Sequence, residues 1–409
     1  MQRSPSRLHW YEGNRIDLLQ NGSQFFAALC QAIDEAQTVV HLETYIFNLD
    51  RTGLSILDHL QQACERGVKV RVVVDGFGSY AHAQEIGERL AAMGAQYRVY
   101  HPEPQGVRRV VFNAKRLRRL HRKVTVVDER IAFVGGINIL DDLEDVPNDG
   151  MGPRPRFDFT VRVQGPLVAE ITATQNSLWL RVGWHHRSDW ANVSARLANW
   201  RAVLLKRRLE KSTRYDSGMR AALVLRDNVR FRQTIENVYL YAIGHASENV
   251  VIANAYFFPG RRLRQALEHA AARGVRVRLL LQGRSEYPMQ HRATRFMYGK
   301  LLDDGIEIYE YQPSYLHAKV AVIDARATVG SSNLDPFSLL LAREANVFVD
   351  NADFAARLNA ALAVVMQNDA RRVTDTFLQK LSMFDRWVDA ASYLLLRIAV
   401  ALTGKSSMY

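Results

Sequence analysis

The chain has 409 residues, of which 48% are hydrophobic and 23% are charged. This composition supports one large or two ordinary globular domains and excludes a wholly disordered chain. Lysine and arginine number 54 against 42 aspartates and glutamates, a formal charge of +12 that favours an anionic partner: nucleic acid, an anionic bilayer or a phosphorylated small molecule. Only two cysteines are present, Cys30 and Cys64, which excludes a disulfide scaffold and a cysteine-rich zinc site. Neither a signal peptide nor an apolar run of membrane-spanning length is expected.

The predicted elements alternate between strands and helices. Residues 38–47 are apolar, β-branched and aromatic, as in a buried strand; a helical pattern follows and ends at Gly67, and a second strand covers 68–75. The same series recurs further on, with a strand at 250–258, a helix ending at Gly274 and a strand at 275–282. This alternation predicts an α/β fold with a mixed, largely parallel sheet flanked by helices.

The recurrence extends over most of the chain and indicates a duplicated domain. Five blocks of the first half reappear in the same order in the second half. They are 43–47 with 254–258, 66–71 with 273–278, 90–102 with 301–313, 121–128 with 317–324, and 158–163 with 344–349. We therefore predict a first lobe at 1–200, a basic linker at 201–217, a second lobe at 218–370 and an amphipathic C-terminal tail at 371–409.

Each half carries a histidine and a lysine two residues apart on a predicted strand, where both side chains project from the same face. These are His121 with Lys123 in the first half and His317 with Lys319 in the second. One histidine can attack a phosphorus atom while the other protonates the leaving oxygen, and the lysines stabilise the phosphoryl charge. A turn of small residues and an asparagine follows each pair and brings further donors to the phosphate: Asn138 in the first half, Ser332 and Asn333 in the second.

Two kinds of carboxylate accompany the motif. Asp158 and Glu344 open the next strand in each half, and we assign Asp158 to His121 and Glu344 to His317 as the groups that orient each imidazole. Asp128 and Asp324 complete the motif, but they lie one alternation off the histidine face, so we interpret them as buried acceptors that hold the motif together.

These residues resemble the phospholipase D superfamily signature, His-x-Lys-x4-Asp-x6-Gly-Ser-x-Asn. The first copy has the superfamily spacing with Gly136 in place of the serine, whereas the second copy is one residue short after Asp324, where we expect a tighter hairpin and an intact site. The resemblance implies two tandem phospholipase D-like lobes related by a pseudo-twofold axis and a covalent phosphohistidine intermediate. It also implies His121 as the nucleophile and His317 as the acid/base, although the sequence alone does not order the two histidines.

Within the superfamily the chain is similar to bacterial cardiolipin synthases, especially the shorter form without N-terminal membrane helices. The similarity is carried by residues 252–259, 330–336 and 344–346. It implies a phosphatidyltransferase that uses phosphatidylglycerol, needs no metal or other cofactor, and works peripherally at an anionic phospholipid membrane, on the cytoplasmic face of the inner membrane. The alternatives are a phospholipase D-type phosphodiesterase that hydrolyses phospholipid or nucleic acid, and a non-enzymatic basic binding module. Nucleic acid is the less favoured partner, because simple nucleases of this type resemble a single half that dimerises.

Four further segments have an ordinary structural interpretation beside a functional one. Residues 105–123 hold eight basic and no acidic residues and are either a solvated loop or a contact with lipid headgroups. Apolar residues recur at helical spacing in the tail, so this stripe either packs on the second lobe or lies in the membrane plane. Its members are Phe377, Leu381, Phe384, Val388, Ala391, Leu395 and Ile398. The acidic loop 141–145 and the histidine pair within 184–187 are expected to bind no metal.

Overall fold

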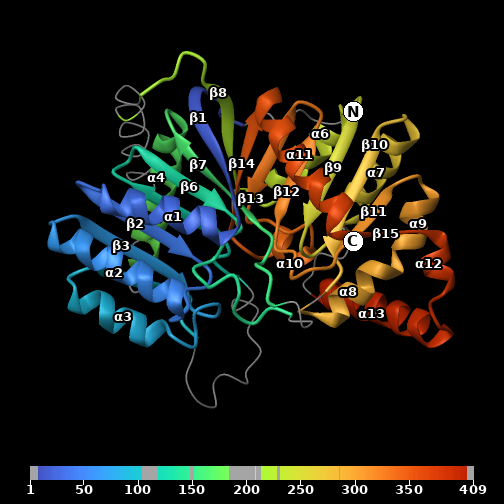
Figure 1. Ribbon diagram of the computed structural model, residues 1–409, viewed down its shortest axis with the longest axis horizontal. Coiled ribbons are helices and arrows are strands. Elements are labelled where there is room, and N and C mark those ends of the chain that lie inside the picture. Colours follow the sequence, from blue (N-terminus) through green and yellow to red (C-terminus); the bar gives the residue numbers. More distant parts are fainter. Residues whose placement is uncertain are drawn as a thin grey trace. The chain divides into compact units, whose positions relative to one another are not determined.

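The computed structural model describes residues 8–103, 118–147, 152–183, 208, 213–227, 231–284 and 286–402 (Figure 1). By their contacts these residues form two compact units. The N-terminal unit comprises the described parts of 9–141 and 160–223, and the C-terminal unit comprises Leu8 with the described parts of 142–159 and 224–402. The predicted domain boundaries stay predictions, but residues 142–159, which lie within the predicted first lobe, pack with the C-terminal unit.

The N-terminal unit contains a mixed sheet with strand order β1-β7-β6-β5-β2-β3-β4, and β1 also pairs with the start of β8. Its strands are β1 (Tyr11–Gln20), β2 (Val39–Thr44), β3 (Lys69–Asp75), β4 (Gln96–Tyr100), β5 (Lys123–Val127), β6 (Ile131–Gly135), β7 (Phe159–Gln164) and the beginning of β8 (Met219–Arg226). Its helices are α1 (Asn21–Asp34), α2 (Arg51–Glu65), α3 (Ala83–Ala92) and α4 (Leu167–Gly183). The apolar side chains of α1 and α2 form the main core with β2 and β3, while Trp179 of α4 packs with Val73 in a second cluster.

The C-terminal unit repeats this order as β14-β13-β12-β9-β10-β11 and adds β15 at the edge. Its strands are β9 (Asn249–Asn254), β10 (Arg276–Gln282), β11 (Glu307–Tyr311), β12 (Lys319–Ile323), β13 (Arg326–Gly330), β14 (Glu344–Asp350) and β15 (Ala370–Val373). Its helices are α6 (Thr234–Gly244), α7 (Arg261–Ala272), α8 (Pro288–Phe296), α9 (Tyr298–Asp303), α10 (Pro336–Leu340), α11 (Ala352–Asn368), α12 (Asp375–Gln379) and α13 (Met383–Leu402).

The predicted duplication and the mixed α/β fold are confirmed, because both units have the same strand order. The predicted helix ends are confirmed too: Gly67 and Gly274 adopt φ angles of +84° and +88°, which a residue without Cβ adopts at no steric cost. The sheets are less parallel than predicted. Among the strand pairs whose orientation the structure describes, those within β2-β3-β4 and β9-β10-β11 are parallel, whereas β5-β6 and β12-β13, which carry the motif, are joined by short hairpins and are antiparallel. The pseudo-twofold axis stays a prediction.

The predicted tighter hairpin is present in the second copy of the motif. Three residues, 128–130, connect β5 to β6, whereas two residues, 324–325, connect β12 to β13. Asp128 and Asp324 nevertheless adopt the same left-handed conformation, with φ of +51° and +50°. The deletion is therefore absorbed by the turn, and the strands on either side of it keep their register.

The amphipathic tail differs from its prediction in one respect. The apolar stripe is not one helix, because Phe377 belongs to α12 and α13 begins only at Met383, where the Ser382 hydroxyl accepts a hydrogen bond from the Asp385 N–H. Of the two interpretations left open for the stripe, packing on the lobe does not hold for Phe384 and Leu395, which are 74% and 58% exposed, whereas Phe377, Leu381 and Val388 are half-buried. In the described part of the chain no helix combines the length and apolar character needed to cross a bilayer. Most of the basic segment 105–123, most of the linker and the histidine pair within 184–187 lie outside the described residues.

Candidate active site

The first half-site lies where β5 begins in the N-terminal unit. Lys123 is 5% exposed, and its Nζ donates a hydrogen bond of 2.7 Å to the carbonyl oxygen of His121. The ring of Tyr45 packs edge-on against the imidazole of His121, with 4.8 Å between centroids, and lies 5.2 Å from the Lys123 ammonium. Asn138 is 7% exposed, and its Oδ1 accepts a hydrogen bond of 3.2 Å from the Ile46 N–H. The structure therefore gathers one histidine, one lysine and one tyrosine at a single strand end.

Two buried acids that were not among the predicted site residues support this half-site. The Asp75 carboxylate accepts hydrogen bonds from the N–H groups of Leu120, Phe77 and Gly78, which fixes the backbone directly before His121. Burial raises the pKa of Asp75 to about 6. Glu43 forms a buried, two-pronged ion pair with Arg122 at 2.6 and 2.9 Å. The sequence signal for Glu43 and Asp75 was the presence of a charged residue in an otherwise apolar strand. The signal for Tyr45 was its recurrence as Tyr256 in the second copy of the repeat.

The second half-site surrounds His317 in the C-terminal unit. Its Nδ1 lies 2.6 Å from Oδ2 of Asp158, a carboxylate that is 3% exposed. When Nδ1 carries the proton that this contact requires, Nε2 is the unprotonated nitrogen of the neutral ring, and the carboxylate stabilises the ring once it is charged. Nζ of Lys319 donates to the His317 carbonyl oxygen and lies 3.7 Å from the same Asp158 oxygen. Burial lowers the pKa of Lys319 to about 8, and the negative charges of Asp158 and Glu344 oppose that shift.

The predicted pairing of Asp158 with His121 is wrong, because Asp158 binds His317. After Asp141 the chain leaves the N-terminal unit and runs beside the approach to β12, where Phe157 bridges Leu316 and accepts a hydrogen bond from the His317 N–H. This extended segment carries Asp158 to the second histidine before the chain re-enters the N-terminal unit at β7. Glu344 accepts a hydrogen bond of 2.5 Å from the Ser331 hydroxyl, so it helps to hold the turn that follows β13, and its role in orienting a histidine stays a prediction.

That turn contains the predicted phosphate-binding residues of the second half. Ser332 is fully buried, and its N–H donates to Oδ1 of Asn346. Asn333 is 4% exposed, and its Oδ1 has no hydrogen-bond partner among the described residues. This oxygen is a hydrogen-bond acceptor, so only the amide NH2 group of Asn333 can donate a hydrogen bond to a phosphoryl oxygen. A Cβ added to Gly330 would lie 2.2 Å from Oδ1 of Asn346, which explains why glycine precedes the turn.

Asp128 and Asp324 lie at the far ends of their strands, away from the histidines. Asp128 accepts hydrogen bonds from the N–H groups of residues 37–39, and Asp324 accepts them from residues 247–249. Each aspartate follows its histidine by seven positions along nearly extended chain, a distance of roughly 20 Å. Both are half-buried rather than buried, and these hydrogen bonds hold the pKa of each carboxyl below its usual range. The structure therefore gives them an anchoring role and does not bring them to the reacting groups.

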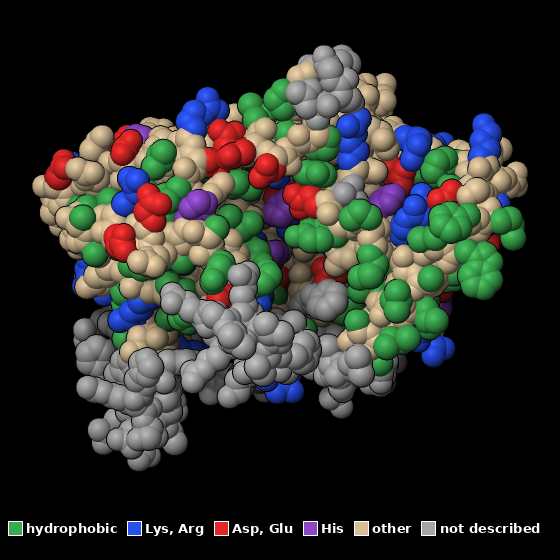
Figure 2. Space-filling view, turned by 90° about the horizontal axis from the view of Figure 1, so that it is seen from below, with side chains coloured by type: hydrophobic (Ala, Val, Ile, Leu, Met, Phe, Trp, Pro, Cys, Tyr) green, Lys and Arg blue, Asp and Glu red, His purple; other side chains and the backbone are tan. Residues whose placement is uncertain are grey.

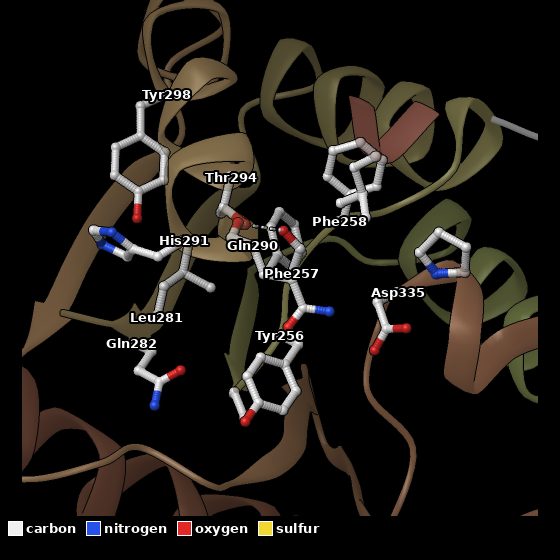
Figure 3. Close-up of a pocket in the computed structure, with 13 residues that line it drawn as sticks. Tyr256, Phe257, Phe258, Leu281, Gln282, Gln290, His291, Thr294, Tyr298 and Asp335 are labelled. Atoms are coloured by element: carbon white, nitrogen blue, oxygen red, sulfur yellow. Dashed lines mark hydrogen bonds between the residues drawn. The ribbon is translucent and has the colours of Figure 1, made fainter. Parts of the chain in front are cut away.

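A small pocket lies beside the second half-site (Figure 3). It is bounded by residues 255–258 after β9, by α8 with His291 and Thr294, and by Asp335, two residues after Asn333. Apolar and aromatic side chains dominate its wall, with Tyr298 at one end. No group of three or more potential metal ligands occurs among the described residues, and Asp141 of the acidic loop instead binds Arg51 at 3.0 Å.

Residues 29–142 and 239–365 match the family described as cardiolipin synthase, PLD-like domain. Cardiolipin synthase B of Shigella flexneri is 38% identical over 398 residues, which cover 97% of this chain and 91% of that protein. Cardiolipin synthase B of Escherichia coli K12 shows the same identity and coverage. Among solved structures, phosphatidylserine synthase of Haemophilus influenzae Rd KW20 superposes with a TM-score of 0.67 at 13% identity, covering 96% of this chain and 95% of that one, a likeness of fold alone.

Proposed function

The chain belongs to the cardiolipin synthase, PLD-like domain family, and we propose that it is a phosphatidyltransferase that forms cardiolipin. The substrate class comes from the relatives, whose names describe cardiolipin synthesis. The chemistry is supported by one observation above all. His317 is held by a buried carboxylate at 2.6 Å beside a buried lysine, an arrangement that suits a proton-transferring imidazole next to a phosphate.

In the proposed reaction, Nε2 of His121 attacks the phosphorus of a donor phospholipid while the bond from phosphorus to the headgroup oxygen breaks. His317 gives its proton to the departing oxygen, and Asp158 stabilises the charged ring before that transfer. The primary hydroxyl of phosphatidylglycerol then attacks the phosphohistidine and returns a proton to His317, which frees His121. Lys123, Lys319, Asn138, Asn333 and Ser332 are proposed to stabilise the phosphoryl oxygens. This mechanism requires both half-sites to act on one phosphorus atom.

We further propose that the protein works peripherally at the cytoplasmic face of the inner membrane. The formal charge of +12 supports attraction to an anionic bilayer, which also contains the proposed acceptor, phosphatidylglycerol.

The test is incubation of the purified protein with labelled phosphatidylglycerol vesicles in EDTA, followed by lipid chromatography. We expect cardiolipin and glycerol to form without added metal, and both His121→Ala and His317→Ala to abolish the reaction. Release of phosphatidic acid as the sole product would instead identify a hydrolase. Cleavage of DNA with no action on lipid would identify a nuclease and refute the proposal.

A further inference from the structure

Helix α13 buries two of its polar side chains and leaves a row of large apolar side chains exposed. Asp389 and Ser392 are 3% and 7% exposed, whereas Trp387 is 74% exposed and Leu394 is 59% exposed. The helices of globular proteins normally show the opposite arrangement, because burial of apolar surface is what stabilises them.

The inward face is held in place by ion pairs with α8. Arg295 binds both oxygens of Asp389 at 2.7 and 2.8 Å, and Arg292 contacts Asp389 at 3.4 Å and Asp385 at 3.3 Å. Leu396 and Val400 complete the buried side. If the helix rotated to bury its exposed apolar side chains, Leu396 and Val400 would become exposed and the buried ion pair between Asp389 and Arg295 would break. These contacts therefore fix the observed orientation of the helix.

The exposed apolar side chains form one continuous face. At about 100° per residue they fall within a sector of roughly 100° along the whole helix. The face consists of Phe384, Trp387, Ala391, Leu394, Leu395 and Ile398. Met289 and Phe296 of α8 are also 48% and 47% exposed. Figure 2 shows hydrophobic side chains gathered at the right of the molecule, where α8 and α13 lie in Figure 1. A patch of this kind on a folded protein marks an interaction surface.

The side chains beside this face identify its partner. Arg386 and Arg397 are exposed and lie roughly 60–80° around the helix from the edge of the apolar sector. When a helix lies in the membrane interface with its apolar sector inserted, side chains at this angle reach the lipid headgroups. Trp387 is the residue type enriched at membrane interfaces. Of the two acidic residues of the helix, Asp389 is buried and Asp385 is half-buried, and both are paired with arginines of α8, so the exposed charges beside the apolar face are those of Arg386 and Arg397. An anionic bilayer suits this surface, because its acyl chains would accept the apolar face, its interface would accept the tryptophan and its headgroups would attract the arginines.

We propose that α13 is the membrane-docking element, lying in the plane of an anionic bilayer with its Phe384–Ile398 face among the acyl chains. This inference deepens the proposed function, on which it rests only for the identity of the lipid. The location of α13 suits this role, because Leu396 of α13 lines the same pocket as Asp335, which follows the turn proposed to bind phosphate. Docking through α13 therefore brings this half-site close to the lipid surface.

The test is flotation of the full chain with vesicles of phosphatidylethanolamine and phosphatidylglycerol, beside vesicles of phosphatidylcholine alone. We expect binding to the anionic vesicles and a loss of about tenfold or more in the double variant Trp387→Ser/Leu395→Ser, since two deeply inserting side chains are removed. Val364→Ser is the matched control, because Val364 is a 56% exposed aliphatic residue on α11 of the same unit, and it should bind as the wild type does.

A soluble substrate separates docking from chemistry. The double variant should turn over monomeric short-chain phosphatidylglycerol at the wild-type rate and lose activity only on vesicles, while His317→Ala should lose both activities and still bind vesicles. Wild-type affinity in the double variant, or no binding by the wild type, overturns the inference. So does a wild-type dimer that the double variant converts to a monomer, which would show that a second copy covers this face. Vesicle binding through α13 without cardiolipin formation would refute the proposed function alone.

Discussion

Replacement of Asp158 by asparagine removes the charge on which the second half-site depends. Oδ2 of Asp158 lies 2.6 Å from Nδ1 of His317 and 3.7 Å from Nζ of Lys319. At an effective dielectric constant of about 20, opposite charges at 3.7 Å attract by roughly 4 kcal/mol. Loss of even half of this attraction lowers the pKa of Lys319, now about 8, to below neutral, and the lysine loses its charge at pH 7. The amide also offers a donor to Nδ1, which favours the wrong tautomer of His317.

We therefore expect Asp158→Asn to lower kcat by about a hundredfold to ten-thousandfold with little change in KM, since both effects act on the transition state. The measurement is cardiolipin formation as a function of pH. The wild-type rate should fall as pH rises through about 8, where Lys319 loses its proton, and in the variant this fall should move below pH 7.

Asp303→Asn is the matched control, because it makes the same change at an exposed position on α9 of the same unit, and its activity should equal that of the wild type. Thermal unfolding of all three proteins checks that each is folded. A kcat of Asp158→Asn within threefold of the wild type, or an unmoved alkaline limb, would refute the reasoning.

Three further substitutions test the same half-site and its supports. Lys319→Met should abolish activity yet raise the free energy of unfolding by about 1–3 kcal/mol at pH 7, because burial disfavours the charged ammonium of the wild type. In the wild type, the free energy of unfolding measured in urea should increase between pH 8 and 10.5, as Lys319 of the folded protein releases its proton. Asp324→Ala should destabilise the protein by about 2 kcal/mol or more at pH 7, since three backbone N–H groups lose their acceptor. The difference in free energy of unfolding between the variant and the wild type should shrink as pH falls below about 4, because the carboxyl of the folded wild type is then protonated. Gly330→Ala should reduce kcat at least about tenfold because its Cβ would collide with Asn346, whereas Gly299→Ala, which meets no atom closer than 4.0 Å, should leave activity unchanged. Equal rates in these two alanine variants would contradict the role given to the turn.

The sequence was sufficient for the local features of this protein. Alternating apolar strands and glycine-terminated helices predicted the elements, and five recurring blocks predicted two copies of one sheet order. The spacing of His317 and Lys319 on a strand placed both side chains at one half-site, and the missing residue after Asp324 was correctly assigned to a tighter hairpin. Each of these features depends on neighbours along the chain, so residue periodicity is enough to reveal it.

Only the tertiary structure decided which distant groups meet. Asp158 opens a strand of the N-terminal unit, and its sequence neighbours say nothing of the excursion that carries it to His317. The apolar stripe of α13 was visible from its spacing, but a helical period does not tell which face is buried; that choice was made by the ion pairs of Asp389 with Arg295 on another helix. Contacts between segments far apart in the chain leave no periodic signature, because each residue type fits several partners and packing selects one of them.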